Sequence, residues 1–153
     1  MPDILRVTVD KFTFLVPPDR FYSPEGLWVL RLGGDADGRV RIGLTDYLQQ
    51  HSGDVAFAET LPVGTRLRAG DDVGTVETIK VNLALPSPVD GTIVEVNRDL
   101  ETSPEVINQD PYDRGWLAVV EVTDWEMQKA RLLGPDAYFA QMKGQAEAEV
   151  KDP

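Results

Sequence analysis

The sequence contains no cysteine and a single histidine, His51. Without thiolates there can be no disulfide framework, cysteine-ligated zinc, iron–sulfur cluster or cysteine nucleophile. A Ser-His-Asp triad or a zinc site could use no imidazole other than that of His51. A lone histidine before Ser52 and Gly53 is more typical of a helix end. We therefore expect no metal site and no catalytic residues, and any redox chemistry must come from a group that the chain does not encode.

Positive charge and long apolar runs are also scarce. Lysine and arginine number 15 against 26 acids, which gives a net charge of −11. With no basic stripe to neutralise phosphates, we expect neither nucleic acid nor an anionic membrane surface as a partner. No run approaches the length of a membrane span, and Met1-Pro2-Asp3 opens without a basic or apolar leader pattern. These features predict a cytoplasmic protein.

The 153 residues, 42% of them hydrophobic, are enough for one globular domain with its own core. Eleven prolines and thirteen glycines separate short β-branched runs, which is typical of an all-β sandwich or barrel. Glycine and aspartate between Gly33 and Gly38 predict a hairpin loop. The predicted strands are Arg6–Val9, Lys11–Val16, Leu27–Leu32, Arg39–Gly43, Val55–Glu59, Arg66–Leu67, Gly74–Lys80, Val81–Leu85, Gly91–Val96 and Trp116–Val122.

Short helices interrupt and follow these strands. Thr45 can cap a helix over Asp46–Gln50, and Ser103 can cap a turn that begins at Pro104. The pattern then predicts a helix from Asp124 to Leu133 and another from Pro135. In the last one, an apolar stripe at helical spacing predicts a face that covers the core. The stripe consists of Tyr138, Phe139, Met142 and Ala146.

One cation stands alone in an acidic stretch. Between Asp71 and Asn97 there are five acids, and Lys80 is the one basic residue. The alternation around it places Thr78, Lys80 and Asn82 on one face of an extended chain. Position by itself fits an ordinary strand lysine that keeps its ammonium in water.

The motifs around Lys80 change this interpretation. Glu77-Thr78-Ile79-Lys80, followed by Ser87-Pro88-Val89-Asp90-Gly91, resembles lipoyl-type carrier domains and is most similar to the H protein of the glycine cleavage system. Further motifs occur in the order of that family over about residues 22 to 140. They are Gly43-Leu44-Thr45-Asp46-Tyr47, Leu61-Pro62-Val63-Gly64-Thr65 and Asn108-Gln109-Asp110-Pro111-Tyr112.

The resemblance implies a mainly β fold, a flattened sandwich or barrel-sandwich hybrid with short helices and a C-terminal helical segment. It implies a single domain over residues 1–153, with an N-terminal extension at 1–21 and C-terminal helices at 124–150. It also implies lipoate as an amide on Lys80, with Glu77, Thr78, Ile79 and Val81 recognised by the ligase or the arm. The chain would be a cofactor-bearing carrier and not an enzyme, since the dithiolane supplies the sulfur pair that it lacks.

The resemblance and local propensity conflict at one place. The family presents its lysine in a tight turn, whereas Thr75 to Leu85 contains neither glycine nor proline. Propensity alone predicts one uninterrupted strand. We follow the resemblance and expect tertiary pairing to enforce the bend.

Two departures from the family bear on the cargo. Family members usually carry His-Glu-Trp where this chain has Gly26-Leu27-Trp28, and a serine and an acid where it has Leu83-Ala84. Apolar groups near the resting arm would solvate a charged amine poorly. We therefore expect a different cargo, as in the lipoate-binding proteins of the sulfur-oxidising heterodisulfide-reductase-like pathway, which these features resemble.

Two other functions stay open. The chain could be a glycine cleavage H protein that carries the aminomethyl group, or an unlipoylated scaffold subunit for which Lys80 is dispensable. The carrier role implies a lipoate-protein ligase and a dihydrolipoamide dehydrogenase-like protein as partners. It also implies either a heterodisulfide-reductase-like complex or glycine cleavage proteins. The net charge predicts basic docking faces on these partners.

Overall fold

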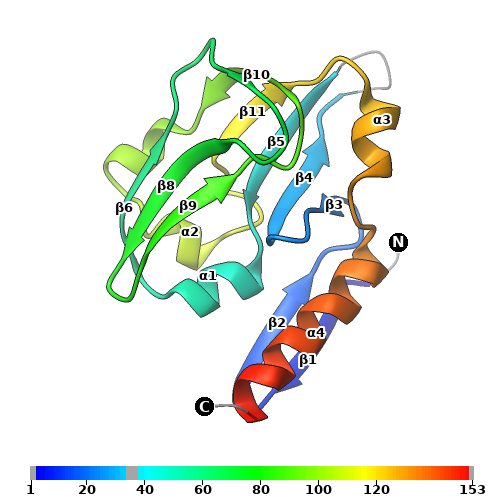
Figure 1. Ribbon diagram of the computed structural model, residues 1–153. Helices are drawn as coiled ribbons and strands as arrows, with labels where there is room; N and C mark the ends of the chain where they lie inside the picture. The colour runs from blue at the N-terminus through cyan, green and yellow to red at the C-terminus, as the bar shows by residue number, and fades with distance from the viewer. Residues whose placement is uncertain (1–2, 34–37, 152–153) are drawn as a thin grey trace.

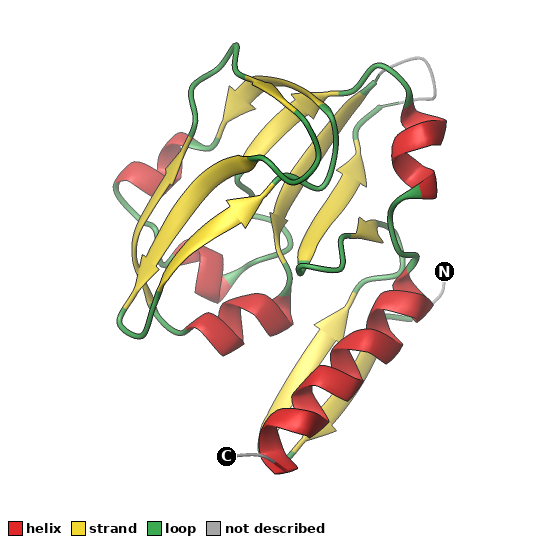
Figure 2. Cartoon of the chain, in the orientation of Figure 1, coloured by secondary structure: helices red, strands yellow, loops and turns green. Residues whose placement is uncertain are grey.

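The computed structural model of the protein describes residues 3–33 and 38–151, and its strands form three antiparallel sheets (Figure 1, Figure 2). One sheet pairs β1 with β2, a second has the order β3-β4-β5-β11-β10-β7, and a third has the order β6-β8-β9. The strands are β1 (Leu5–Val9), β2 (Phe12–Val16), β3 (Phe21–Tyr22), β4 (Leu27–Arg31), β5 (Arg39–Leu44), β6 (Val55–Thr60), β7 (Arg66–Leu67), β8 (Asp72–Thr78), β9 (Asn82–Pro86), β10 (Gly91–Val96) and β11 (Ala118–Glu121). The helices are α1 (Asp46–Ser52), the 3-10 helix η1 (Arg98–Glu101), α2 (Val106–Gln109), α3 (Trp125–Ala130) and α4 (Pro135–Lys151).

The main core lies between the six-stranded and the three-stranded sheets. Strands of both sheets contribute buried side chains to it, as a two-sheet arrangement requires. Ile42 of β5, Val76 of β8 and Ile93 of β10 are fully buried there. The expected mainly β sandwich with short helices and a C-terminal helix is thereby confirmed, and the described strands do not close into a barrel.

A second apolar cluster joins the N-terminal hairpin β1–β2, α1 and α4. In it α4 lies along the hairpin (Figure 1), and Tyr138, Met142 and Ala146 are buried. Phe139 is half-buried against the same cluster, so the predicted apolar stripe is confirmed as a core-covering face. The two strands before Phe21 thus form a hairpin that α4 covers.

Most predicted strands match observed ones within two residues at each end. The short strand β3 was not predicted, because two residues carry too little pattern to stand out. The hairpin loop predicted between Gly33 and Gly38 has its central residues, 34–37, outside the described ranges. The glycine at position 43 serves close packing: a Cβ there would lie 2.5 Å from the Trp28 ring, its cross-strand neighbour.

The helix predictions were less accurate at their ends. Thr45 caps α1 as expected, its Oγ1 accepting from the Leu48 amide, but the helix continues to Ser52. The turn predicted from Pro104 is present, since the Val106 amide donates to the Ser103 carbonyl, but α2 itself starts at Val106 after a Glu105 cap that makes no side-chain hydrogen bond.

Asp124 caps α3 through a bond from the Met127 amide, and α3 ends at Ala130 rather than Leu133. The 3-10 helix η1 was not anticipated, since Asn97 caps it within a stretch that carries no helical periodicity.

Candidate functional site

The turn between β8 and β9 carries the candidate site. Strand β8 ends at Thr78 and β9 begins at Asn82, so residues 79–81 form the tip of this hairpin, which lies beside the end of α1 (Figure 1). The expected bend at Lys80 is confirmed, and the predicted strands Gly74–Lys80 and Val81–Leu85 differ from β8 and β9 by at most two residues at each end. The alternation that grouped Thr78, Lys80 and Asn82 on one face was wrong, since the chain reverses between them. Pairing of β8 with both β6 and β9 outweighs the local preference for one long strand.

Lys80 is exposed at the tip of this turn. Its Nζ donates a hydrogen bond to the carbonyl oxygen of His51 at 3.0 Å. Within the described part of the chain no carboxylate forms an ion pair with this ammonium. The amine is thus held by one exposed hydrogen bond and is not locked in a buried pair, so an acylating enzyme can reach it.

The end of α1 forms the platform under the turn. A cation at a helix C-terminus interacts favourably with the partial negative charge of the unpaired carbonyls, and Lys80 occupies that place. Gly53 ends the helix with φ +96°, a conformation that residues with a Cβ rarely adopt. A Cβ there would also lie 3.2 Å from Cδ of Lys80, so this glycine leaves room for the lysine stem.

Helix α4 holds this platform in place. The Tyr47 hydroxyl donates to the Glu149 carboxylate, and His51 Nδ1 lies 2.9 Å from the same oxygen. The Tyr47 and His51 rings stack at 5.7 Å. Burial, reinforced by the bond to Glu149, raises the pKa of Tyr47 above its ordinary value. The helix-end interpretation of His51 agrees with its place in the last turn of α1.

The other predicted site residues surround Lys80 but differ in orientation. Ile79 is 78% exposed and Val81 43% exposed, and Glu77 is also open to solvent. Thr78 instead turns its hydroxyl inward, toward the turn amides and the carbonyl of Ser52. The structure thus offers Glu77, Ile79 and Val81 for contact and uses Thr78 within the turn.

Sequence reasoning missed the contribution of α1 to this site. Ser52, Gly53 and Asp54 contact the turn although they lie more than twenty residues before it. The Gly53-Asp54 pair after the helix could have indicated them, but the local sequence does not show that the β8–β9 turn packs against this pair.

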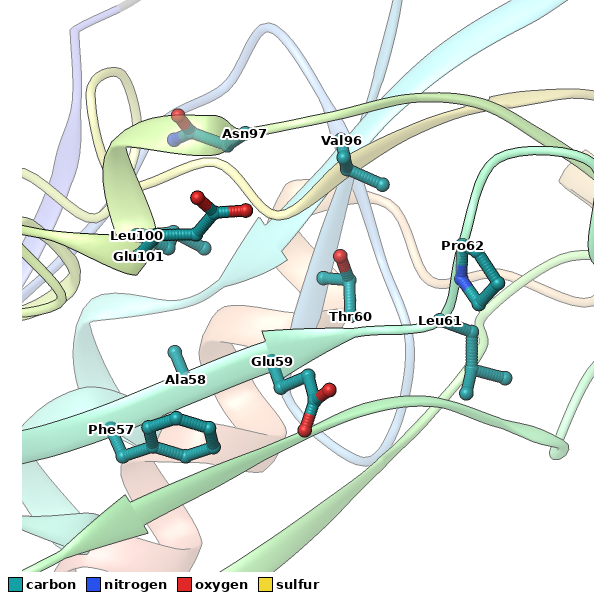
Figure 3. Close-up of a pocket in the computed structure, with 10 residues that line it drawn as sticks. All are labelled: Phe57, Ala58, Glu59, Thr60, Leu61, Pro62, Val96, Asn97, Leu100 and Glu101. Carbon is teal, nitrogen blue, oxygen red and sulfur yellow. The ribbon is translucent and has the colours of Figure 1, made fainter.

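A groove of about 570 Å³ opens beside β6, between this strand and the segment that joins β10 to η1 (Figure 3). Phe57 pairs across the sheet with Glu77, so one end of the groove approaches the turn. The lining residues are Phe57, Ala58, Glu59, Thr60, Leu61, Pro62, Val96, Asn97, Leu100 and Glu101. None of them is a lysine, so the groove supplies no amine for acylation.

A metal site does not emerge from the described residues, which contain no group of three or more side chains placed to hold an ion. Nor is any helix within the described ranges both long and apolar enough to cross a membrane.

A mainly β framework that presents an exposed lysine at a hairpin tip is the architecture of a carrier domain of lipoyl type. The family model of the glycine cleavage H-protein matches residues 20–145. The chain belongs to this family.

Individual relatives agree with the family match. The chain is 41% identical over 125 residues to the glycine cleavage system H protein of Oceanobacillus iheyensis, covering 82% of this chain and 95% of that protein. It is 44% identical over 126 residues to that of Mycobacterium avium, covering 80% and 93%. The crystal structure of the H protein from Mycobacterium marinum superposes with a TM-score of 0.73 at 34% identity, covering 82% of this chain and 98% of that one.

Family membership confirms the expected lipoate cofactor and the expected carrier role, but it does not support the expected sulfur-oxidation pathway. Glycine cleavage H proteins carry lipoate covalently on a lysine and have no catalytic activity of their own, as expected for a carrier. The preference for the sulfur-oxidising branch is not supported, because the named relatives are glycine cleavage proteins and agree better with the alternative. The apolar residues near Lys80 were too little evidence to choose between the sulfur-oxidation and the glycine cleavage pathways.

Proposed function

We propose that this chain is a lipoyl carrier with Lys80 as its attachment site, and that it serves as the H protein of a glycine cleavage system. The observation that carries the proposal is the exposed amine at the tip of the β8–β9 turn, in a chain of this family. The amine fits an acyl group because Lys80 is exposed at the turn and the one described partner of its Nζ is a backbone carbonyl.

The chain's own contribution to attachment is simple. The ammonium of Lys80 must leave the His51 carbonyl and lose a proton before its lone pair can attack an activated acyl carbon. The new C–N bond replaces the bond to the leaving group, and a second proton leaves the nitrogen. When bound, lipoate supplies a dithiol–disulfide pair for redox and group-transfer chemistry.

A direct test uses the purified chain with lipoate, ATP and a lipoate-protein ligase. Intact mass should show one lipoyl group on the wild type and on Lys143→Arg, a control at an exposed lysine of α4. Lys80→Arg should stay unmodified with an unchanged circular dichroism spectrum. A lipoyl group on Lys80→Arg would overturn the assignment. Its absence from wild type would favour the scaffold function.

The glycine cleavage role is tested with the lipoylated chain. We expect label from glycine to reach the protein when a glycine decarboxylase is added, and Lys80→Arg to receive none. Glu77, Ile79 and Val81 are proposed to contact the ligase or the arm, since all three are exposed beside Lys80. Substituting each by alanine should raise the KM for lipoylation.

One observation favours a second candidate, a carrier of sulfur intermediates. Leu27 is fully buried in the main core, and Leu83 is half-buried against it. The glutamate position of the usual His-Glu-Trp motif is thus an apolar core position here, whereas Ala84, which replaces the second acid, is exposed. A charged amine gains no partner from Leu27, Leu83 or Ala84. Transfer of persulfide sulfur to the reduced arm, without label from glycine, would select this candidate and a heterodisulfide-reductase-like complex as partner.

The remaining partner and domain assignments follow from the same proposal. We expect a dihydrolipoamide dehydrogenase-like protein to reoxidise the arm, and residues 1–153 to act as one unit with the extension 1–21 and the helices within 124–150. The contacts between α4 and the N-terminal hairpin support the unit. The cytoplasmic location stays a prediction.

A further inference from the structure

We propose that Thr78 is a positioning residue for lipoylation: its hydroxyl closes the turn that carries Lys80 and fastens this turn to the end of α1. The inference rests on the proposed attachment at Lys80 and assigns a distinct role to a neighbour that does not receive the acyl group. In this role Thr78 supports the reaction from inside the protein and makes no contact with the ligase.

The hydroxyl closes the turn from within. Thr78 Oγ1 accepts hydrogen bonds from the backbone amides of Lys80, at 3.1 Å, and Val81, at 3.0 Å. The Thr78 amide donates to the Val81 carbonyl at 2.8 Å. Side-chain oxygens of serine and threonine can replace a backbone acceptor in this way and so stabilise a turn.

The same hydroxyl fastens the turn to α1. A hydroxyl has one proton to donate, and the shorter of its two contacts to carbonyl oxygens is to Ser52, at 2.7 Å, against 3.1 Å to Val81. The Ile79 amide adds a bond to the Asp54 carbonyl at 3.2 Å. The turn is thereby tied to the chain on both sides of Gly53, directly beneath the stem of Lys80.

These polar contacts matter because little else can hold the turn. Ile79 faces solvent and buries little apolar surface, and Val81 is only partly covered. The segment also lacks the glycine or proline that usually specifies a tight reversal. The Thr78 hydroxyl takes the place of a turn-forming residue, because it bonds both to the amides of the turn and to the Ser52 carbonyl.

A disordered turn would present Lys80 to the ligase in the competent conformation only part of the time, which raises the apparent dissociation constant by the inverse of that fraction. Losing the hydrogen bonds of the hydroxyl predicts a rise of about tenfold in the KM for lipoylation of Thr78→Val. The kcat should change little, because Lys80 itself is intact.

The experiment compares lipoylation kinetics of wild type, Thr78→Val, Thr78→Ser and Thr75→Val. Thr75 is an exposed residue of the same strand without a role in the turn, so its variant controls for valine in β8. We expect Thr78→Ser and Thr75→Val to behave as wild type. Amide exchange of Lys80 and Val81 in the unmodified proteins should be faster in Thr78→Val alone.

Several results would overturn the inference. They are a wild-type KM for Thr78→Val, a loss in Thr78→Ser as large as in Thr78→Val, or unchanged amide exchange at Lys80 and Val81. Should Thr78→Val fail to fold, Thr78→Ala is compared with Thr78→Ser. If neither the alanine nor the valine variant folds, the hydroxyl is required for folding of the whole protein, and the specific role in the turn is refuted. If wild type and Thr75→Val accept no lipoyl group, the proposed function itself fails. Equal lipoylation of all four proteins refutes only the role of Thr78.

Discussion

The ammonium of Lys80 donates a hydrogen bond to the carbonyl oxygen of His51, 29 residues earlier in the chain and one residue before the end of α1. A side chain proposed for acylation therefore serves, while unmodified, as a cap on a helix. Attachment of an acyl group removes the positive charge and with it the favourable interaction with the helix terminus. The modification should thus change the stability of the fold as well as its chemistry.

Neutralising Lys80 should destabilise the protein slightly. We expect Lys80→Gln to lower the free energy of unfolding by about 0.3–1 kcal/mol, the usual worth of a cation at a helix C-terminus. Lys80→Arg keeps the charge and should unfold like wild type, and the lipoylated protein should resemble the glutamine variant. Urea denaturation measures these differences, which should shrink in high salt. Equal stability of glutamine and arginine variants would show that the contact with His51 contributes nothing.

Two glycine substitutions should act in opposite directions. Gly53→Ala places a Cβ at φ +96° and 3.2 Å from the Lys80 stem, so we expect a loss of about 1–3 kcal/mol. Gly144 lies in α4 with open space around it, and Gly144→Ala should raise the free energy of unfolding by about 0.5–1 kcal/mol. Thermal or urea unfolding of the pair measures both effects, and a stable Gly53→Ala protein would contradict the strained conformation.

Removing the Met142 side chain should open a cavity beneath α4. This residue is fully buried between the helix and the N-terminal hairpin, and Met142→Ala should cost about 2–5 kcal/mol. The neighbouring Lys143→Ala, at an exposed position, should stay within about 0.5 kcal/mol of wild type. If both variants unfold at the same denaturant concentration, α4 does not contribute its apolar face to the core.

All four tyrosines should resist ionisation while the protein is folded. Burial raises the pKa of Tyr138 to about 12, and burial also raises the pKa values of Tyr22, Tyr47 and Tyr112. Because each pKa is higher in the folded than in the unfolded state, the stabilisation is complete below about pH 10 and is lost as the pH rises through the folded values.

Tyrosinate absorbance, followed together with circular dichroism, tests this prediction. We expect no absorbance change near pH 10 in the native protein, and a change at higher pH that coincides with unfolding. The same protein in denaturant should titrate near pH 10 and serves as the control. A tyrosine that ionises reversibly near pH 10 in the folded state would contradict its burial.

The pattern of residues in the sequence was sufficient to predict most of the strands and the buried face of the C-terminal helix. Short β-branched runs between glycines and prolines identified the longer strands, and the helical spacing of Tyr138, Met142 and Ala146 identified the buried face of α4. Absence of cysteine and scarcity of histidine indicated that any redox chemistry must come from a group that the chain does not encode. The motif around Lys80 then indicated the family.

Tertiary structure alone decided how that lysine is presented. Propensity favours a continuous strand through Thr78 and Lys80, and only pairing of β8 with strands on both sides, together with the α1 carbonyls, makes the chain reverse there. The burial of Leu27 in the main core was likewise invisible to a motif comparison, which placed this position near the resting arm. Hydrogen bonds between segments distant in the chain depend on where the whole fold places them, and no local pattern encodes that placement.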